Sequence, residues 1–322
     1  MGNCFGAKSP SHHVPTLHIT PSEELILYSS NSEIFTFNTL QSATNNFSND
    51  NLLGQGGFGS VFRGLIDGNG TCMEVAVKKL EPLARLDNKE WTAEIKYLGK
   101  LHHHNIVRLI GYCKEDQHRM LVYELMPNGS LDKHLFEMGL GLQPLSWNLR
   151  IKIALGVANG LAFMHSEADR NPIVHMDIKS ANVLLDSNYN AKLADFGLAL
   201  DSPARVTKKM RGTKGYADVF SCKKGRIDTM YDVYSFGVVL LEMLSGQIVL
   251  DPNRPVKDLK IWVKPYLENK GEMIHIFDPR LGGEYPLMVA KKLTSLSYQC
   301  ISEPKYRPTM AELVGALESL QT

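Results

Sequence analysis

One segment near the middle of the chain restricts the possible folds most, because it combines several reactive groups at fixed spacing. Residues 175–182 read H-M-D-I-K-S-A-N, and the tripeptide D-F-G begins at Asp195, thirteen residues after Asn182. Asp177 can accept or orient the proton of a substrate hydroxyl, and Lys179 can neutralise negative charge on a transferring group. Asn182 and Asp195 offer the oxygen ligands that Mg²⁺ prefers. A chance loop with isolated Asp and Asn residues is the alternative.

A glycine-rich stretch lies earlier in the chain, where residues 54–61 read G-Q-G-G-F-G-S-V. Glycines let a backbone approach phosphates closely and present its N–H groups to them. A dinucleotide-binding fold also uses G-x-G-x-x-G, but it needs a helix directly afterwards, and here residues 60–64 continue as a strand. A structural hairpin is the other alternative for this motif alone. The residues expected to contact a nucleotide here are Leu53, Gly54, Gly56, Gly57, Phe58, Gly59 and Val61.

A lysine and a glutamate lie between these two motifs. Lys78 ends the strand-like run V-A-V-K, where its amine can reach the α- and β-phosphates of a nucleotide. Glu94 lies on a helix expected over residues 89–100 and can hold Lys78 in place, since an unpaired lysine would position its charge poorly. Alone, each would be read as an ordinary exposed residue. The ordered occurrence of all the motifs favours phosphoryl transfer from ATP with Mg²⁺ as the chemistry.

The coarse secondary structure separates a strand-rich region from a helical one. Strands are expected over residues 52–59, 60–66, 73–80, 106–113 and 119–125. From about residue 126 helices predominate, and one of them is expected over Trp147–His165. The pattern predicts an α+β fold with a small lobe over about residues 52–125 and a larger lobe over about 126–320. Ligand sites favour the cleft between two such lobes.

Composition excludes several other classes of protein. The 322 residues carry a net charge of +1, and without a clustered Lys/Arg face we expect no nucleic-acid partner. The five cysteines are scattered and form no C-x-x-C pair, which favours reduced thiols over a disulfide framework or a zinc site. The apolar run from Val233 to Leu250 contains Glu242, so a buried helix is favoured over a membrane span.

The motifs make the chain similar to the eukaryotic protein kinases over about residues 35–320, and within them to plant receptor-like cytoplasmic kinases. The resemblance implies a bilobal protein-kinase fold that binds ATP and Mg²⁺ between its lobes. Beyond the motifs above, it rests on F-T-F at 35–37, A-T-N-N-F at 43–47, N-I-V-R-L-I-G-Y-C at 105–113, L-V-Y-E at 121–124, D-V-Y-S-F-G at 232–237 and R-P-T-M at 307–310.

The resemblance also implies roles for residues outside the two main motifs. Tyr123 is expected to be the gatekeeper of the nucleotide pocket, and the backbone of Glu124 and Met126 to hydrogen-bond adenine. Asp232 is expected to brace the catalytic loop from a buried helix. Together with Lys179, Thr213 matches the pattern of kinases specific for serine and threonine. The implied partners are a protein substrate and a membrane receptor kinase.

Two departures from the family pattern concern the segment after the D-F-G motif. Met176 replaces the arginine that normally pairs with a phosphate on this segment, so the kinase should not depend on that phosphate. The segment from Asp195 to Gly212 is also about four residues shorter than in similar kinases. Thr207 and Ser202 are the obvious phosphoacceptors that it retains before Thr213.

A third departure is the loss of the A-P-E motif, whose place is taken by D-V-F at residues 218–220. In the family its glutamate pairs with an arginine that Arg307 matches, and Phe220 cannot form that pair. A buried Arg307 without a partner would be costly unless another acceptor substitutes, and Asp218 is one candidate. Two hypotheses follow. The first is an active serine/threonine kinase, and the second is a kinase-fold adaptor that binds ATP and acts through contacts with a receptor kinase.

The first 34 residues differ from the rest of the chain, with little periodicity and many Ser, Pro, His and Asn residues. We expect them to form a flexible tail. The N-terminal sequence M-G-N-C resembles a dual lipidation site, with myristate on Gly2 and palmitate on Cys4. The expected location is the cytosolic face of the plasma membrane. An unmodified tail on a cytoplasmic protein is the alternative, because Gly6 stands where the myristoylation pattern has Ser or Thr.

Overall fold

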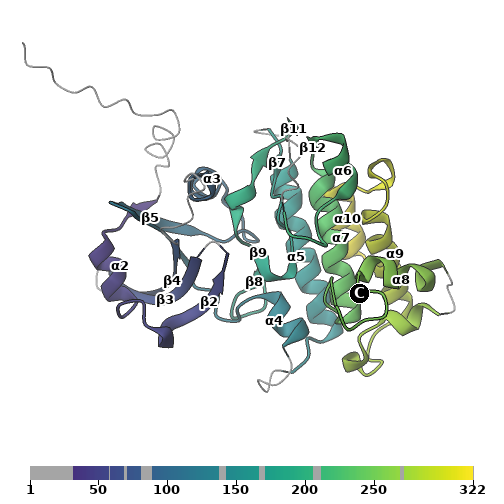
Figure 1. The fold of residues 1–322 in the computed structure, drawn as a ribbon. Helices are drawn as coiled ribbons and strands as arrows, with labels where there is room; N and C mark the ends of the chain where they lie inside the picture. Colours follow the sequence, from purple (N-terminus) through teal and green to yellow (C-terminus); the bar gives the residue numbers. More distant parts are fainter. Residues whose placement is uncertain are drawn as a thin grey trace, which may run out of the picture.

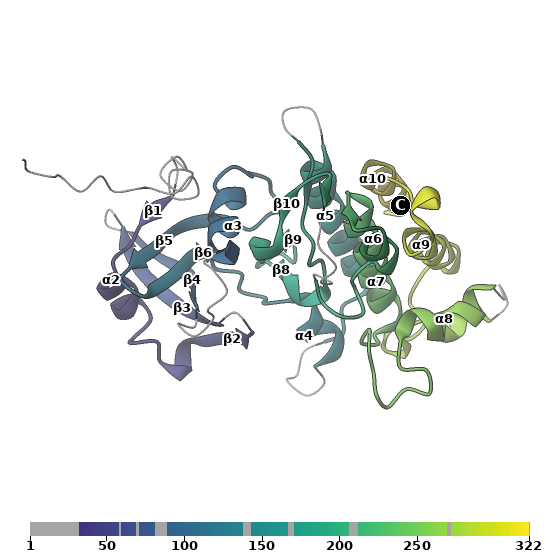
Figure 2. The same cartoon turned by 45° about the horizontal axis from the view of Figure 1, so that its top comes forward.

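The computed structural model describes residues 32–57, 59–68, 71–80, 89–137, 143–166, 171–205, 212–268 and 272–321. It has two lobes, one rich in strands and one rich in helices (Figures 1 and 2). The short strands β8 (Val183–Leu185) and β9 (Ala191–Leu193) lie between the sheet of the small lobe and the helices of the large one. The α+β fold expected from the sequence is therefore confirmed.

The small lobe is built on a six-stranded sheet with the order β1-β5-β6-β4-β3-β2. Its neighbours are antiparallel except for β1 and β5, which are parallel. Two helices accompany the sheet: α2 spans Phe37–Ala43 and α3 spans Lys89–Leu98. The strands are β1 Glu33–Ile34, β2 Leu52–Gly56, β3 Gly59–Gly68, β4 Thr71–Leu80, β5 Leu109–Glu115 and β6 His118–Glu124.

The small lobe begins earlier than the sequence indicated, because Glu33 and Ile34 belong to the sheet and not to the tail expected over residues 1–34. Phe35 is buried, and its N–H donates to the carbonyl of Tyr112 at 2.9 Å. Gly111 permits this pairing, since a side-chain carbon there would lie 2.2 Å from the carbonyl oxygen of Glu33. A two-residue strand leaves no periodic signal, so its pairing could not be predicted.

The large lobe is mainly helical. Its helices are α4 Leu131–Phe136, α5 Trp147–His165, α6 Val219–Lys224, α7 Met230–Ser245, α8 Leu259–Glu268, α9 Leu287–Cys300 and α10 Met310–Glu318. Its strands are β7 Ile173–Val174, β8 Val183–Leu185, β9 Ala191–Leu193, β10 Leu200–Asp201, β11 Ala204–Arg205 and β12 Arg226–Ile227. Of these short strand pairs, β8–β9 lies on the side that faces the sheet, while β11–β12 lies beside α6. The 3₁₀ turns used below are η2, Ser180–Asn182, and η3, Phe196–Leu198.

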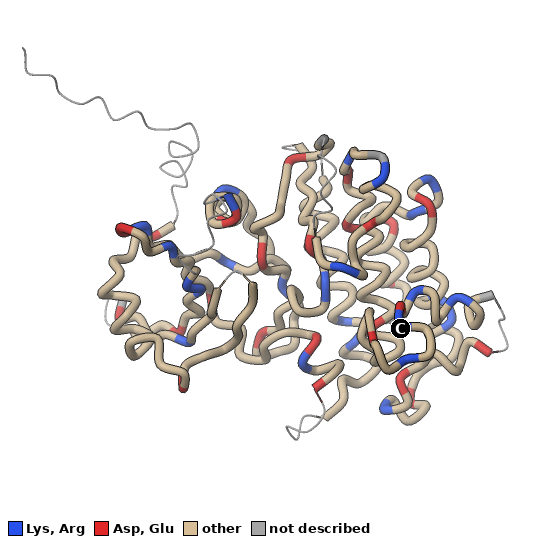
Figure 3. The backbone as a smooth tube through the Cα atoms, in the orientation of Figure 1, with Lys and Arg blue, Asp and Glu red and all other residues tan. Residues whose placement is uncertain are grey.

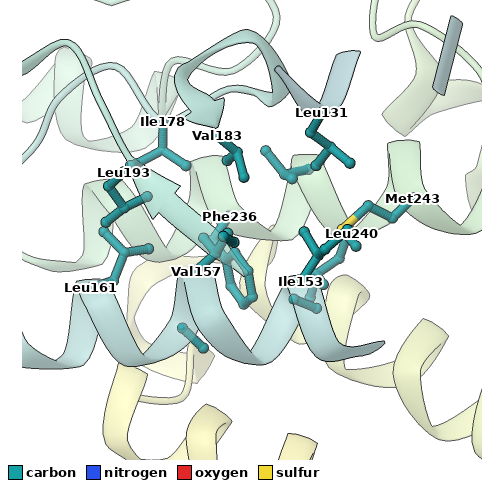
Figure 4. Close-up of a cluster of buried hydrophobic side chains, with 14 of the residues drawn as sticks. Leu131, Ile153, Val157, Leu161, Ile178, Val183, Leu193, Phe236, Leu240 and Met243 are labelled. Atoms are coloured by element: carbon teal, nitrogen blue, oxygen red, sulfur yellow. The ribbon is translucent and has the colours of Figure 1, made fainter. Parts of the chain in front are cut away.

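The core of the large lobe lies between α5 and α7. Figure 4 shows side chains of α5 pointing toward Phe236 and Leu240 of α7. Ile178 and Val183 lie above them. The helix expected over residues 147–165 has those bounds, and Ser146 caps it by accepting from the N–H of Leu149. Every residue of α7 from Tyr231 to Ser245 is buried. Within the described residues, no helix is both long and apolar enough to span a membrane.

Candidate active site

A cavity of about 570 Å³ lies between the two lobes. Its walls come from β2, β3 and β4, the segment after β6, the start of α4, and the loops around η2 and η3. Gly57 is not among its lining residues, and Phe58 lies outside the described residues. The expected site residues that line the cavity are Leu53, Gly54, Gly56, Gly59, Val61, Lys78, Glu94, Tyr123, Glu124, Met126, Asn182 and Asp195.

The glycines above the cavity differ in what their surroundings require. Strands β2 and β3 pair antiparallel, with Gly56 opposite Gly59. A side-chain carbon on Gly54, Gly56 or Gly57 would meet no atom of the described residues within 4 Å, so packing among these residues does not explain the three glycines. Gly59 has a φ of +136°, and a side-chain carbon there would lie 2.1 Å from the carbonyl oxygen of Lys79. The fold therefore needs Gly59, while Gly54 and Gly56 leave open space at the roof of the cavity.

Lys78 lies at the centre of an ion-pair cluster on the cavity wall. Its Nζ is 2.6 Å from Oε1 of Glu94 and 2.8 Å from Oδ1 of Asp195. The other oxygen of Glu94 accepts a hydrogen bond from the hydroxyl of Tyr123. The sequence indicated the pairing of Lys78 with Glu94 but missed the part of Tyr123, because its hydroxyl reaches Glu94 only across the folded sheet. The cluster thus joins β4, α3, β6 and the D-F-G segment.

Burial and charge oppose each other in this cluster. Burial alone would lower the pKa of Lys78, but the carboxylates of Glu94 and Asp195 outweigh it and raise that pKa well above its usual range. Burial acts to raise the pKa of Asp195, yet the charge of Lys78 prevails and lowers it. For Glu94, burial is stronger than the attraction of Lys78, and its pKa is raised. A cationic lysine and an ionised Asp195 therefore face the cavity together.

The side chain of Asp177 is held on both oxygens. Its Oδ2 accepts from Nζ of Lys179 at 2.7 Å and from the amide of Asn182 at 3.2 Å. Its Oδ1 accepts from both the N–H of Thr213 at 2.9 Å and the hydroxyl of Thr213 at 2.6 Å. Lys179 also donates to the Thr213 hydroxyl at 3.0 Å. Four residues that the sequence identified separately are thus joined in one hydrogen-bonded group.

Asp232 supports this loop from helix α7. The side chain is fully buried, and its two oxygens accept from the N–H groups of His175 at 2.7 Å and Met176 at 3.0 Å. The Nε2 atom of His165 lies 3.1 Å from the same carboxylate. Met176 has a φ of +72°, a left-handed conformation that is unfavourable for a methionine. The contacts from Asp232 help to hold the backbone in it.

Comparison with known proteins agrees with this geometry. Residues 47–317 match the family model described as protein tyrosine and serine/threonine kinase. The chain is 49% identical to Receptor-like cytoplasmic kinase 176 of Oryza sativa subsp. japonica, over 100% of this chain and 90% of that protein. It is 47% identical to Serine/threonine-protein kinase BIK1 of Arabidopsis thaliana, over 99% of this chain and 84% of that protein. The chain belongs to the serine/threonine protein kinases.

In this kinase an apolar residue, Met176, stands where the family pattern has an arginine. The methionine side chain is buried with Val174, Ala217, Ile227 and Tyr231. This cluster joins the catalytic loop to the segments on either side of α6 through apolar contacts. At this position Met176 contributes an apolar side chain and no charge. The expected phosphoacceptor Thr207 lies outside the described residues.

The missing A-P-E glutamate has a substitute two residues earlier in the chain. Arg307 is buried, and its guanidinium donates to both oxygens of Asp218, at 2.8 and 3.1 Å. Asp218 also caps α6 by accepting from the N–H groups of Phe220 and Ser221. The candidate partner named from the sequence is confirmed. Phe220 remains 40% exposed, and its ring centroid lies 5.7 Å from the guanidinium carbon of Arg307.

Several residues that line the cavity were not expected from the sequence, and one of them is a charged residue of the large lobe. Lys133, on α4, lines the cavity, and its Nζ donates to the carbonyl of Leu53 on β2 at 3.2 Å. The contact crosses from the large lobe to the small lobe at the edge of the cavity. Its only signal in the sequence is its place shortly after the tripeptide P-N-G at residues 127–129, which does not distinguish it from any exposed lysine. Gly2 and Cys4 lie outside the described residues.

Proposed function

We propose that this kinase transfers the γ-phosphate of ATP to serine or threonine hydroxyls of protein substrates, in receptor-linked signalling at the cytosolic face of the plasma membrane. The observation that supports the transfer best is the ion-pair cluster of Lys78 with Glu94 and Asp195, at 2.6 and 2.8 Å. Protein kinases need this lysine–glutamate pair and the D-F-G aspartate in place at the same time.

Nucleotide binding follows from the cavity walls. Gly54 and Gly56 leave room for phosphates in the cavity, and Lys78 approaches the α- and β-phosphates. Leu53 and Val61 cover the adenine, and the backbone of Glu124 and Met126 hydrogen-bonds its edge. Tyr123 closes the inner end of the pocket as gatekeeper.

Two side chains suit a divalent metal. Asp195 uses Oδ1 for Lys78, and Asn182 uses its amide nitrogen for the backbone carbonyl of Asp177 at 2.8 Å. Each therefore keeps an oxygen for Mg²⁺, which prefers oxygen ligands and usually takes phosphates as well. When bound, Mg²⁺ would neutralise charge on the β- and γ-phosphates.

The remaining residues act on the substrate. Asp177 orients the substrate hydroxyl and accepts its proton, while Lys179 offsets negative charge on the group in transit. Thr213 is bonded to both, and together with Lys179 it matches the pattern of kinases specific for serine and threonine. The adaptor hypothesis drew its support from the loss of A-P-E, and the Asp218–Arg307 pair supplies a partner for Arg307 in place of the lost glutamate. This favours the enzyme, and the transfer assay below distinguishes it from a kinase-fold adaptor that binds ATP.

Location and partners rest on the N-terminal sequence and on relatives. We infer that the chain is anchored through myristate on Gly2 and palmitate on Cys4, with an unanchored cytoplasmic form as the alternative. The name Receptor-like cytoplasmic kinase 176 favours a receptor kinase as the partner. The tail before Glu33 would carry the anchor, and the kinase domain, expected from residue 35 to residue 320, would begin with strand β1 at Glu33. If Gly2→Ala and wild-type protein fractionate identically into the cytosol, the anchor is excluded.

Transfer is tested with purified protein, radiolabelled ATP, and a protein substrate rich in serine and threonine. Removing the catalytic carboxylate should lower the rate about 10²- to 10⁴-fold, so Asp177→Asn should lose nearly all incorporation. Asp186→Asn is a matched control, because Asp186 lies nearby in the chain but bonds its own turn at Asn188 and Asn190. Equal incorporation by wild type and Asp177→Asn would exclude the proposed transfer.

A further inference from the structure

Helix α3 and strand β10 are joined by an ion pair at a position that no kinase motif covers. Nζ of Lys96 lies 2.7 Å from Oδ2 of Asp201. Lys96 also donates to the hydroxyl of Tyr97 at 3.1 Å, which restricts its side chain. The two side chains are 30% and 51% exposed, so the pair lies at the surface and not in the core.

The two ends of this pair belong to elements that both hold Lys78. Lys96 is two residues after Glu94 on α3, and Asp201 is six residues after Asp195 on the D-F-G segment. Glu94 and Asp195 are the two carboxylates bonded to Lys78. The Lys96–Asp201 pair therefore closes a second connection between the same two elements, away from the cavity.

Other contacts also hold the D-F-G segment, at its start and farther along the chain. At its start the D-F-G segment packs against α3, and a side-chain carbon on Gly197 would lie 3.1 Å from Cβ of Glu90. Farther along, Leu200 and Asp201 pair with β7 through the backbone, and Leu200 packs on the apolar cluster around Met176. Methionine supplies no charge to orient the segment. Lys96 and Asp201 form an ion pair within the protein, and it needs no phosphate.

We propose that Lys96 and Asp201 are positioning residues: their ion pair keeps α3 against the D-F-G segment, so that Glu94 and Asp195 hold Lys78 without a phosphorylated loop. The inference rests on the proposed roles of those three residues in ATP binding. In kinases with an arginine at position 176, a phosphate orders the segment after D-F-G. Here the carboxylate of Asp201 takes that part.

The expected effect is modest because both side chains are partly exposed. Exposed ion pairs contribute little, and a two- to fivefold loss of kcat is the range that such pairs allow. Screening should reduce the difference between wild type and variants at high ionic strength. A contribution to nucleotide positioning should lower kcat while the KM for the protein substrate stays unchanged.

The test compares Lys96→Gln, Asp201→Asn and the charge exchange that combines Lys96→Asp with Asp201→Lys. Lys100→Gln is the matched control, since Lys100 is an exposed lysine just beyond the end of α3. We expect each single variant to lose two- to fivefold in kcat at low salt. The exchange should recover most of that loss, and Lys100→Gln should behave as wild type. Single variants that match Lys100→Gln, or a loss that the exchange does not recover, would overturn the proposal.

A second measurement separates this proposal from the proposed function. Amide hydrogen exchange of α3 reports its attachment whether or not phosphate is transferred. Faster amide hydrogen exchange over residues 89–98 in both single variants, with wild-type rates restored in the double variant of exchanged charges, supports the positioning role. Unchanged exchange in the single variants excludes it. If the wild type transfers no phosphate at all, the proposed function fails. The amide hydrogen exchange rates of α3 still decide the role of the Lys96–Asp201 pair.

Discussion

Gly56 and Gly59 face each other across the β2–β3 pair but meet different demands. Gly59 combines a φ of +136° with a backbone oxygen where a side chain would begin, so it serves the fold. A side-chain carbon on Gly56 would meet no atom of the described residues within 4 Å, and we propose that this space holds the phosphates of ATP. The sequence motif treats the two alike, because spacing alone does not reveal a positive φ.

The two glycines should therefore respond differently to the same substitution. Gly59→Ala is expected to lower the free energy of unfolding by about 1–3 kcal/mol, since a strained backbone and a close contact arise together. Gly56→Ala should leave the thermal unfolding midpoint almost unchanged and weaken ATP binding, because its methyl group enters the space for phosphates. Thermal unfolding and nucleotide titration of both variants check this. Equal destabilisation by the two substitutions would contradict it.

At the scale of elements, α6 shows how a lost motif can be replaced. Its N-cap Asp218 bonds the helix start and Arg307 just before α10, so one carboxylate performs two tasks. Substituting Asp218 by alanine leaves a buried guanidinium without its charge partner, and this should cost about 3–5 kcal/mol of stability.

The family glutamate offers a direct control for this prediction. Combining Asp218→Ala with Phe220→Glu should recover part of the lost stability, because Phe220 already lies beside the Arg307 guanidinium. Phe220→Ala alone should have a small effect. Chemical denaturation of the three variants measures the differences. A stable Asp218→Ala protein would show that other acceptors, such as the carbonyl of Ser302, satisfy Arg307 without it.

The elements also show which parts of the fold the sequence could predict. Periodicity located α5 to the residue, and the strands of the small lobe within a few positions. It could not locate β1 or the turn at Asn45–Phe47, where three consecutive residues have positive φ. The motifs identified most residues of the site. They did not indicate the Tyr123–Glu94 or Lys96–Asp201 contacts, because these depend on distances between elements far apart in the chain.

Across the whole molecule, charges of both signs are mixed along the described chain in both lobes (Figure 3). One acidic residue, Glu242 on α7, differs from these charges in that it is fully buried. Its Oε1 accepts from the Tyr216 hydroxyl at 2.6 Å and the N–H of Val249 at 3.2 Å. Its Oε2 has no hydrogen-bond partner among the described residues. Burial raises the pKa of Glu242 to about 7.

This pKa makes global stability depend on pH. Between the ordinary value of 4.5 and about 7, the folded state keeps a proton that the unfolded state has released. The free energy of unfolding should therefore fall as pH rises through this window, by up to about 3 kcal/mol, and level off above it. Glu242→Gln should remove that fall. Denaturation curves collected across the window measure it, and parallel pH profiles for wild type and variant would contradict the account.

The central claim is that the site is complete without a phosphate on the segment after D-F-G. The most direct test is the initial rate of γ-phosphate transfer by protein treated with phosphatase, compared with untreated protein and with Asp177→Asn. We expect the treated and untreated enzymes to start at the same rate, and Asp177→Asn to fall about 10²- to 10⁴-fold below both. A treated enzyme that starts slowly and gains activity as it becomes phosphorylated, or one no faster than Asp177→Asn, would contradict the claim.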